Sequence, residues 1–120
     1  MASTKTLFEI PLTRALVTNS DTAAVTLVGA DSGSSYMQTY TTNGTYTLPA
    51  VASGKGKVWI FNNANTTSTI AITAPSAIMY ANDGTGTTNT CSAVSGSWCM
   101  VTCDGTNYFC FEGYGTWTLT

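Results

Sequence analysis

The chain has 120 residues, enough for one domain with a modest hydrophobic core. Hydrophobic residues make up 43% of it and charged residues only 8%, where roughly a quarter is usual, so the chain is too apolar for disorder and poor in solubilising groups. The net charge of -2, four scattered basic residues and no apolar run near the roughly 20 residues of a membrane span argue against nucleic-acid and membrane partners.

The first 20 residues are expected to form an N-terminal arm or an edge strand, because Pro11 interrupts their apolar run. Glu9, Pro11 and Arg14 leave no uninterrupted apolar stretch of the kind that a secretory signal needs. The cysteines are therefore expected to stay in a reducing cytosol.

Residues 21–120 predict a single all-β domain, an antiparallel β-sandwich of jelly-roll type. Short β-type runs alternate with Gly, Asn, Asp and Ser turns about every ten residues, and no segment keeps helical spacing for three turns. The polar segment 81–90 is predicted to be a mobile loop. Strands are expected at residues 7–10, 24–28, 35–40, 45–48, 57–62, 69–73, 77–80, 98–103, 108–112 and 116–119.

The segment CMVTCDGTNYFCF, residues 99–111, predicts a β-hairpin around Asp104-Gly105. A two-residue loop would place Cys99 opposite Cys110, whereas a four-residue loop would place Cys110 opposite Val101; a three-residue loop would change the faces. Both even loops give the same two apolar faces, typical of a strand pair inside a sandwich or at a subunit contact. One face holds Trp98, Met100, Thr102, Phe109 and Phe111, and the other holds Cys99, Val101, Cys103, Tyr108 and Cys110.

The four cysteines, Cys91, Cys99, Cys103 and Cys110, are interpreted as small buried hydrophobic residues, and their redox state stays open. A disulfide is geometrically possible for a directly opposed pair, but the expected reducing compartment disfavours it. A zinc site is disfavoured because the spacing lacks paired Cys-x2–4-Cys units and the chain has no histidine.

No catalytic, cofactor-binding or metal-binding residue is predicted, and the chain is not expected to be an enzyme. A cysteine nucleophile needs a neighbouring base or cation, and histidine is absent. Most of the acidic residues lie beside Gly, Ser or Asn, where a turn role explains them. Phosphate-binding glycine motifs are absent.

Four tyrosines with polar neighbours are candidates for exposed recognition contacts, whereas the other aromatic residues lie in apolar strands and are expected to pack in the core or an interface. These candidates are Tyr36, Tyr40, Tyr46 and Tyr114.

Two segments, KVWIFNNANTTSTIAIT (residues 57–73) and SAVSGSWCMVTCDGTNYFCFEG (residues 92–113), resemble modules of tailed-bacteriophage structural proteins. In those modules an apolar strand ends in Asn before a Thr/Ile/Val strand, and a later strand leads through an Asp-Gly-Thr-Asn turn into an aromatic strand. Tyr108 stands here where Trp is frequent, and the cysteines have no counterpart in the pattern. The resemblance implies a non-enzymatic β-sandwich that assembles as a homotrimer.

Within that class, a chain running from Met1 to Thr120 is expected to be complete, which favours a capsid decoration (cement) protein over a longer tail fibre. Such a protein would bind the major capsid protein on the virion surface after assembly in the host cytoplasm. The alternative is a head- or tail-fibre module that recognises a receptor or glycan. If the N-terminal segment is an arm rather than an edge strand, its capsid contacts would be Leu7, Phe8, Ile10 and Leu12.

Overall fold

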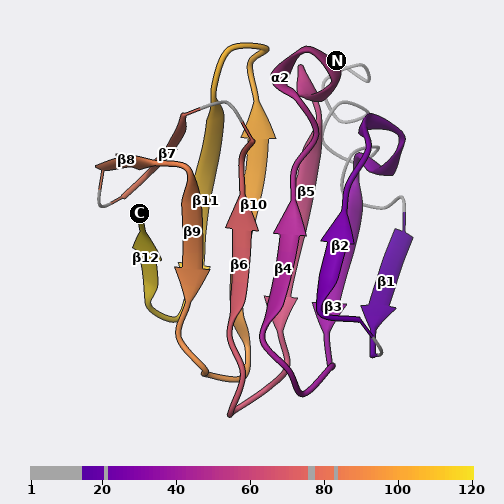
Figure 1. Cartoon of the computed structure of the whole chain (residues 1–120), viewed down its shortest axis with the longest axis vertical. Helices are drawn as coiled ribbons and strands as arrows, with labels where there is room; N and C mark the ends of the chain where they lie inside the picture. Colours follow the sequence, from indigo (N-terminus) through magenta and orange to yellow (C-terminus); the bar gives the residue numbers. More distant parts are fainter. Residues whose placement is uncertain (1–14, 21, 76–77, 83) are drawn as a thin grey trace, which may run out of the picture.

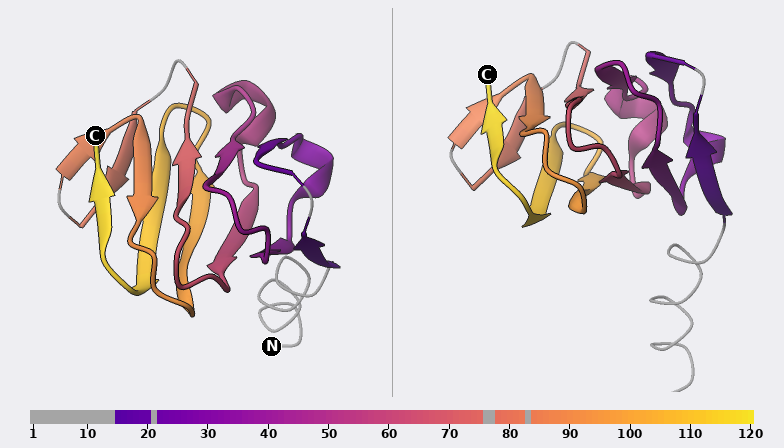
Figure 2. Two further views of the ribbon diagram at one scale, coloured as in Figure 1. Left: turned by 60° about the horizontal axis from the view of Figure 1, so that its bottom comes forward. Right: turned by 90° about the horizontal axis from the view of Figure 1, so that it is seen from below.

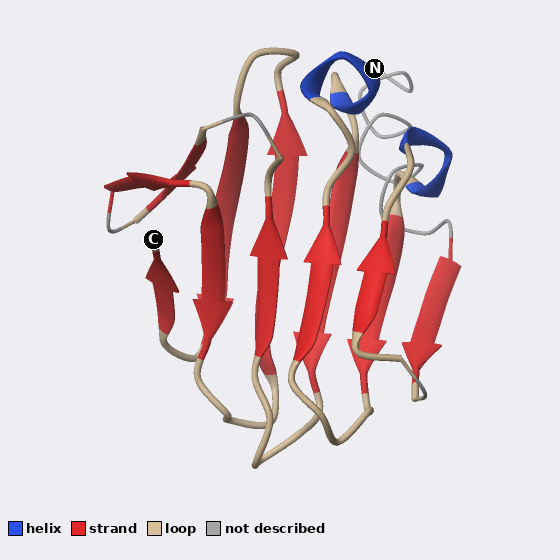
Figure 3. Cartoon of the chain, in the orientation of Figure 1, coloured by secondary structure: helices blue, strands red, loops and turns tan. Residues whose placement is uncertain are grey.

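The computed structural model describes residues 15–20, 22–75, 78–82 and 84–120, and these residues form two β-sheets packed face to face (Figure 1, Figure 2). The larger sheet has the order β1 (Ala15–Asn19), β3 (Ser34–Gln38), β5 (Val58–Asn63), β10 (Ser97–Cys103), β11 (Tyr108–Tyr114), β7 (Met79–Ala81), β8 (Gly84–Gly86). The smaller sheet has the order β12 (Trp117–Leu119), β9 (Thr88–Cys91), β6 (Ile70–Thr73), β4 (Gly44–Thr47), β2 (Ala24–Thr26). A 3-10 turn η1 (Gly29–Asp31) and the one-turn helix α2 (Val51–Gly54) lie at one end (Figure 3). The all-β prediction is confirmed.

The first half of the chain is a flattened coil that crosses between the two sheets at every turn (Figure 1). Strands β1, β3 and β5 are parallel neighbours in one sheet, and β2, β4 and β6 are parallel neighbours in the other. The prediction of antiparallel sheets is therefore wrong for this half. Polar turns separate the strands as expected, but they lead the chain to the opposite sheet instead of closing hairpins, and turn chemistry alone does not distinguish the two.

The second half folds back mainly by antiparallel pairing. Strand β9 pairs with β6, β10 pairs with β5, and β12 pairs with β9, all antiparallel. The exception is β7, which runs parallel to β11 over two residue pairs and forms an edge hairpin with β8. Both sheets are consequently mixed.

The hydrophobic core fills the space between the sheets, and an aromatic cluster forms part of it. The Tyr46 ring lies 5.1 Å from Phe61 and 5.6 Å from Tyr36, centroid to centroid. Because inward and outward side chains alternate along each strand, one face of each strand supplies this core. Its buried members are Leu27, Tyr36, Tyr46, Leu48, Trp59, Phe61, Ile70, Ile72, Ala74, Met79, Cys91, Cys99, Val101, Cys103, Tyr108, Cys110 and Trp117.

A buried polar row closes the core at the end opposite to the helices. Asn19, Gln38, Asn63 and Ser97 stand opposite one another on four adjacent strands, and all four are buried. The Asn19 Nδ2 atom donates to Gln38 Oε1 at 2.8 Å, and Asn63 Nδ2 donates to the Ser68 carbonyl at 2.8 Å. Asn19 thus bonds the side chain opposite it on β3, and Asn63 bonds the carbonyl of the buried Ser68, so both hydrogen bonds favour this register of the strands.

Several elements differ from the sequence-based expectation. Segment 81–90, expected to be a loop, contains all of β8 and three of the four residues of β9, and Asn89 of β9 is buried. Strand β1 and helix α2 were not predicted. The expected strand at residues 7–10 lies outside the described residues. Of the expected N-terminal arm or edge strand, residues 15–19 form the edge strand β1, and residues 1–14 lie outside the described part.

Candidate functional site: an uncharged aromatic sheet face

The β10–β11 hairpin has the four-residue loop, one of the two even loops predicted. Cys103 pairs with Tyr108 and Val101 pairs with Cys110. The Asp104 carboxylate accepts the backbone N–H groups of Thr106 and Asn107, each at 2.8 Å. These hydrogen bonds lower the pKa of Asp104, which is fully exposed. The loop is thus held by its own side chain.

The two faces of the hairpin are divided as predicted, but only one is covered. The inner face, with Cys99, Val101 and Tyr108 among its members, is buried between the sheets. On the outer face, Trp98 is 40% exposed and Phe111 is 54% exposed. In the single chain, the expected burial of both faces is therefore wrong for the outer side.

The outer side presents what we call the aromatic face: Tyr80, Trp98, Met100, Phe109 and Phe111, from β7, β10 and β11. The Tyr80 and Phe109 rings are stacked, with centroids 5.5 Å apart and planes 16° apart. The Trp98 indole occupies the space over Gly113, since a Cβ placed on Gly113 would lie 2.0 Å from its Cε2 atom. The face is thus a continuous apolar surface on three strands of the larger sheet.

No charged residue interrupts this face in the described part of the chain. Asp31, Lys55, Lys57 and Asp104 lie in or beside the turns at the helix-bearing end. Glu112 belongs to β11, but its Oε2 atom accepts a hydrogen bond from Asn89 Nδ2 of the opposite sheet at 2.8 Å. The one carboxylate of the hairpin strands is therefore turned away from the aromatic face.

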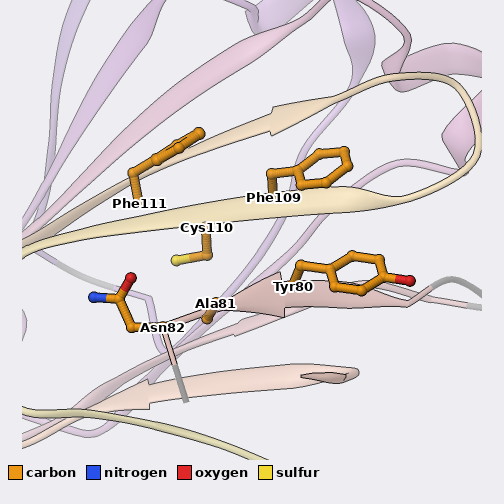
Figure 4. A pocket seen from close by; sticks show the side chains of 6 residues that line it. All are labelled: Tyr80, Ala81, Asn82, Phe109, Cys110 and Phe111. Carbon is orange, nitrogen blue, oxygen red and sulfur yellow. The ribbon is translucent and has the colours of Figure 1, made fainter. Parts of the chain in front are cut away.

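A shallow, open pocket of about 210 Å³ adjoins the aromatic face between β7 and β11 (Figure 4). At this place β7 pairs with β11 over only two positions. Its volume is below the roughly 300–1,000 Å³ typical of small-molecule sites, so it suits a single apolar side chain better than a metabolite. Its lining residues are Tyr80, Ala81, Asn82, Phe109, Cys110 and Phe111.

The four cysteines are free thiols and all are buried. Burial, followed by the neighbouring Cys110, raises the pKa of Cys99 well above its usual value. Burial likewise raises the pKa of Cys91. Because the thiolate is the reactive form, these shifts make Cys91 and Cys99 poor nucleophiles at neutral pH. Within the described ranges, no three or more residues of the metal-ligating types lie together in an arrangement that could hold a metal ion.

The four tyrosines predicted to be exposed fall into different environments. Tyr36 and Tyr46 are buried in the core, so their predicted exposure is wrong; both point inward from β3 and β4 despite their polar neighbours. Burial, with Asp31 second, raises the pKa of Tyr36 to about 12. Tyr40 is half-buried, and Tyr114 is 56% exposed. The predicted capsid contacts, Leu7, Phe8, Ile10 and Leu12, lie outside the described residues.

The residues missed as a surface were Tyr80, Trp98, Phe109 and Phe111. The alternation of side chains along the hairpin places the last three on one face. The sequence does not indicate which of the two apolar faces is exposed to solvent. Tyr80 lies beside them because β7 pairs in parallel with β11, and no local sequence pattern predicts this pairing.

No protein-family model matches the sequence, and no curated protein matches it. Neither helix in the described part of the chain has the length and hydropathy required to cross a membrane.

Proposed function

We propose that the protein is a non-enzymatic structural protein of a tailed-bacteriophage virion, a homotrimeric decoration protein that binds assembled capsids. The observation that carries the proposal is the aromatic face: a β domain presents large apolar side chains on the outer side of a sheet, and no charged residue of the described part lies on that side. The resemblance of residues 57–73 and 92–113 to phage structural modules supplies the virion context. The burial of all four thiols agrees with a mechanical role, because a buried thiol is not an accessible nucleophile.

The mechanism is added interface area on the assembled shell. A trimer that contacts neighbouring major capsid subunits binds the lattice but not a free subunit, so it shifts the assembly equilibrium by mass action. In this proposal Leu7, Phe8, Ile10 and Leu12 are the capsid contacts. The attraction is mainly apolar, and it therefore depends little on ionic strength.

The experiment is a capsid-binding assay with the major capsid protein encoded by the same phage. Purified protein is mixed with assembled shells and with free subunits at low salt and at about 0.5 M NaCl, where the Debye length is about 4 Å. We expect co-sedimentation with shells alone at both salt concentrations, and a higher temperature of shell disruption. The variant Phe8→Ser should bind more weakly. Loss of binding at high salt, or equal binding to free subunits, would contradict the proposal.

A second candidate is a fibre-type recognition module, and it is favoured by the same exposed rings, which can pack against sugar rings. Trp98 is the one tryptophan of the three that is exposed, because Trp59 and Trp117 are buried. A bound glycan should therefore shield Trp98 from acrylamide quenching. A glycan array without hits would remove this candidate.

A further inference from the structure

We propose that the outer side of the smaller sheet binds the surface of ice. The ligand is a neutral, hydrogen-bonded lattice of water, and the binding groups are threonine hydroxyls and methyls. The inference goes beyond the proposed function, and it does not involve the aromatic face, which belongs to the other sheet.

Every strand of the smaller sheet carries the same three-residue pattern. The first and third residues are Thr or Ala and point outward, whereas the middle residue points into the core, as Tyr46 does between Thr45 and Thr47. The five triplets are AVT (residues 24–26), TYT (45–47), AIT (71–73), TNT (88–90) and TLT (118–120).

The strand registers bring the first outward residue of each strand, or the third where the chain direction is reversed, into one row across the sheet. Each member of this row is paired with the next. The row consists of Ala24, Thr45, Ala71, Thr90 and Thr118.

A second row lies beside the first and contains only threonine. Its members are Thr26, Thr47, Thr73, Thr88 and Thr120. Thr120 stands opposite Thr88, because the N–H of each donates to the carbonyl of the other, at 2.8 Å and 3.1 Å. Thr73 Oγ1 and Thr88 Oγ1 are 3.1 Å apart, so hydroxyls of neighbouring strands meet on this side. We call the two rows the threonine face.

The spacing of the threonine face matches that of ice in both directions. Neighbouring strands lie about 4.8 Å apart, and residues two apart along a strand are separated by about 6.7 Å. In a tetrahedral network of O–H···O hydrogen bonds of about 2.75 Å, second-neighbour oxygens lie about 4.5 Å apart, and the layers repeat after about 7.3 Å. Both periods therefore agree to within about 10%.

The side chains of the threonine face hold this spacing without much loss of entropy. Threonine is branched at Cβ, so its χ1 angle is restricted. Each hydroxyl can donate one hydrogen bond and accept two. In Figure 1 strands β4, β6 and β9 lie side by side with nearly aligned axes, which keeps the rows regular. Water molecules bound to these hydroxyls would consequently be held in rows at nearly the positions that an ice lattice requires.

Charge and area favour a water lattice over a protein partner. No charged residue of the described part lies on the threonine face, so the neutral lattice displaces no hydration shell of an ion. The face extends about 19 Å over four strand spacings and about 13 Å along strands of three to four residues, or about 250 Å². A specific protein contact needs about 800 Å² from each partner.

The test is ice binding by the purified full chain. A single ice crystal is held in the protein solution, and the gap between its melting and freezing temperatures is measured. A slowly grown ice hemisphere then shows whether dye-labelled protein enters the ice. The dye is attached to amino groups, because Lys55 and Lys57 lie beside helix α2 and off the threonine face. We expect a temperature gap, faceted crystals and retention in the ice.

Substitutions at the centre of the threonine face identify the surface. Thr73→Tyr and Thr90→Tyr each place a ring over the rows, and each should abolish the gap and the retention. Thr102→Tyr is the matched control, since Thr102 is equally half-buried but faces outward from β10 of the larger sheet, and it should keep both. Circular dichroism checks the fold of each variant. Thr118→Tyr, at an exposed position on the edge strand β12, serves if a central variant does not fold.

The outcomes separate this inference from the proposed function. A wild-type chain that gives no gap and is excluded from ice would overturn the inference, while the decoration role would still depend on capsid binding alone. Ice binding that persists in all of the folded threonine-face variants would overturn the assigned surface. Retention on crystalline chitin or cellulose without retention in ice would overturn the assigned ligand.

Discussion

Tyr108 and Gly54 provide a sharp test of how the hairpin is joined to the helix-bearing end. Tyr108 is buried, its hydroxyl donates to the Pro49 carbonyl, and its ring lies 6.4 Å from Trp59, centroid to centroid. Tyr108→Phe keeps the ring and removes the donor. Leaving a buried acceptor without its hydrogen bond costs about 1–3 kcal/mol. Because Pro49 is only half-buried and water can reach its carbonyl in part, we expect a loss of about 1–2 kcal/mol. For 120 residues this lowers Tm by about 4–8 °C.

Gly54→Ala should break the same hydrogen bond by displacing the Tyr108 hydroxyl. A Cβ on Gly54 would lie 2.5 Å from the Tyr108 hydroxyl oxygen and 3.2 Å from its Cζ atom. The hydroxyl has to move, although alanine itself favours a helix by about 0.5–1 kcal/mol over glycine. In the double variant the oxygen is already absent. We therefore expect the double variant to cost about 1 kcal/mol less than the sum of the two single variants.

The assay is urea and thermal unfolding of the wild-type chain, both single variants and the double variant, followed by circular dichroism. Tyr114→Phe is the matched control, because this tyrosine is 56% exposed, and its free energy of unfolding should change by less than about 0.5 kcal/mol. Strict additivity of the two substitutions would refute the contact. A Tyr108→Phe variant as stable as the wild type would refute the role of the hydrogen bond.

Three further predictions concern pH, thiols and the hairpin turn. The chain has no histidine, so Tm should be constant from about pH 5.5 to 8. The pKa of Cys91 is raised and that of Tyr36 is raised to about 12, so the folded state holds these protons more tightly than the unfolded state. Stability should therefore fall as the pH rises past the unfolded pKa values of 9.0 for Cys91 and 10.0 for Tyr36. A calorimetric series across pH 5.5–11 checks this, and a fall below pH 8 would contradict it. Cys99 should resist a thiol reagent in the native protein and react in guanidinium chloride, as mass spectrometry would record; rapid native labelling would contradict its burial. Gly105→Ala should cost about 1–2 kcal/mol, since Gly105 has φ +96°. Asp104→Ala should lower the urea midpoint, since two backbone N–H groups lose their acceptor. Urea midpoints equal to wild type would show that the turn is not held this way.

The hairpin was the part of the candidate site that local reasoning predicted best. Side chains alternate strictly along a strand, so one turn signal at Asp104-Gly105 assigned the faces of both β10 and β11. For Tyr36 and Tyr46, by contrast, polar neighbours in the sequence do not indicate exposure, because inward and outward residues alternate along β3 and β4. They lie inward, and the Tyr46 hydroxyl finds a buried partner in Gln38 Oε1 at 2.6 Å.

Strand β9 could not be predicted from its own sequence. Its residues Thr88, Asn89 and Thr90 resemble a loop, yet Asn89 is buried between the sheets. Its Nδ2 atom donates to Cys110 Sγ at 3.3 Å and to Glu112 Oε2 at 2.8 Å. Partners 21 and 23 residues away make this asparagine a core residue, and no window around it contains that information.

The amino-acid sequence alone determined the all-β class and the hairpin with its two faces, because these follow from composition and from alternation within one segment. Only the tertiary structure decided that the early strands pair in parallel across a two-sheet coil. Only it decided that Trp98, Phe109 and Phe111 meet Tyr80 on an open face from which Glu112 is turned away. Pairing between distant strands depends on which side chains meet in the shared core, and that choice is made by the packing of the whole chain.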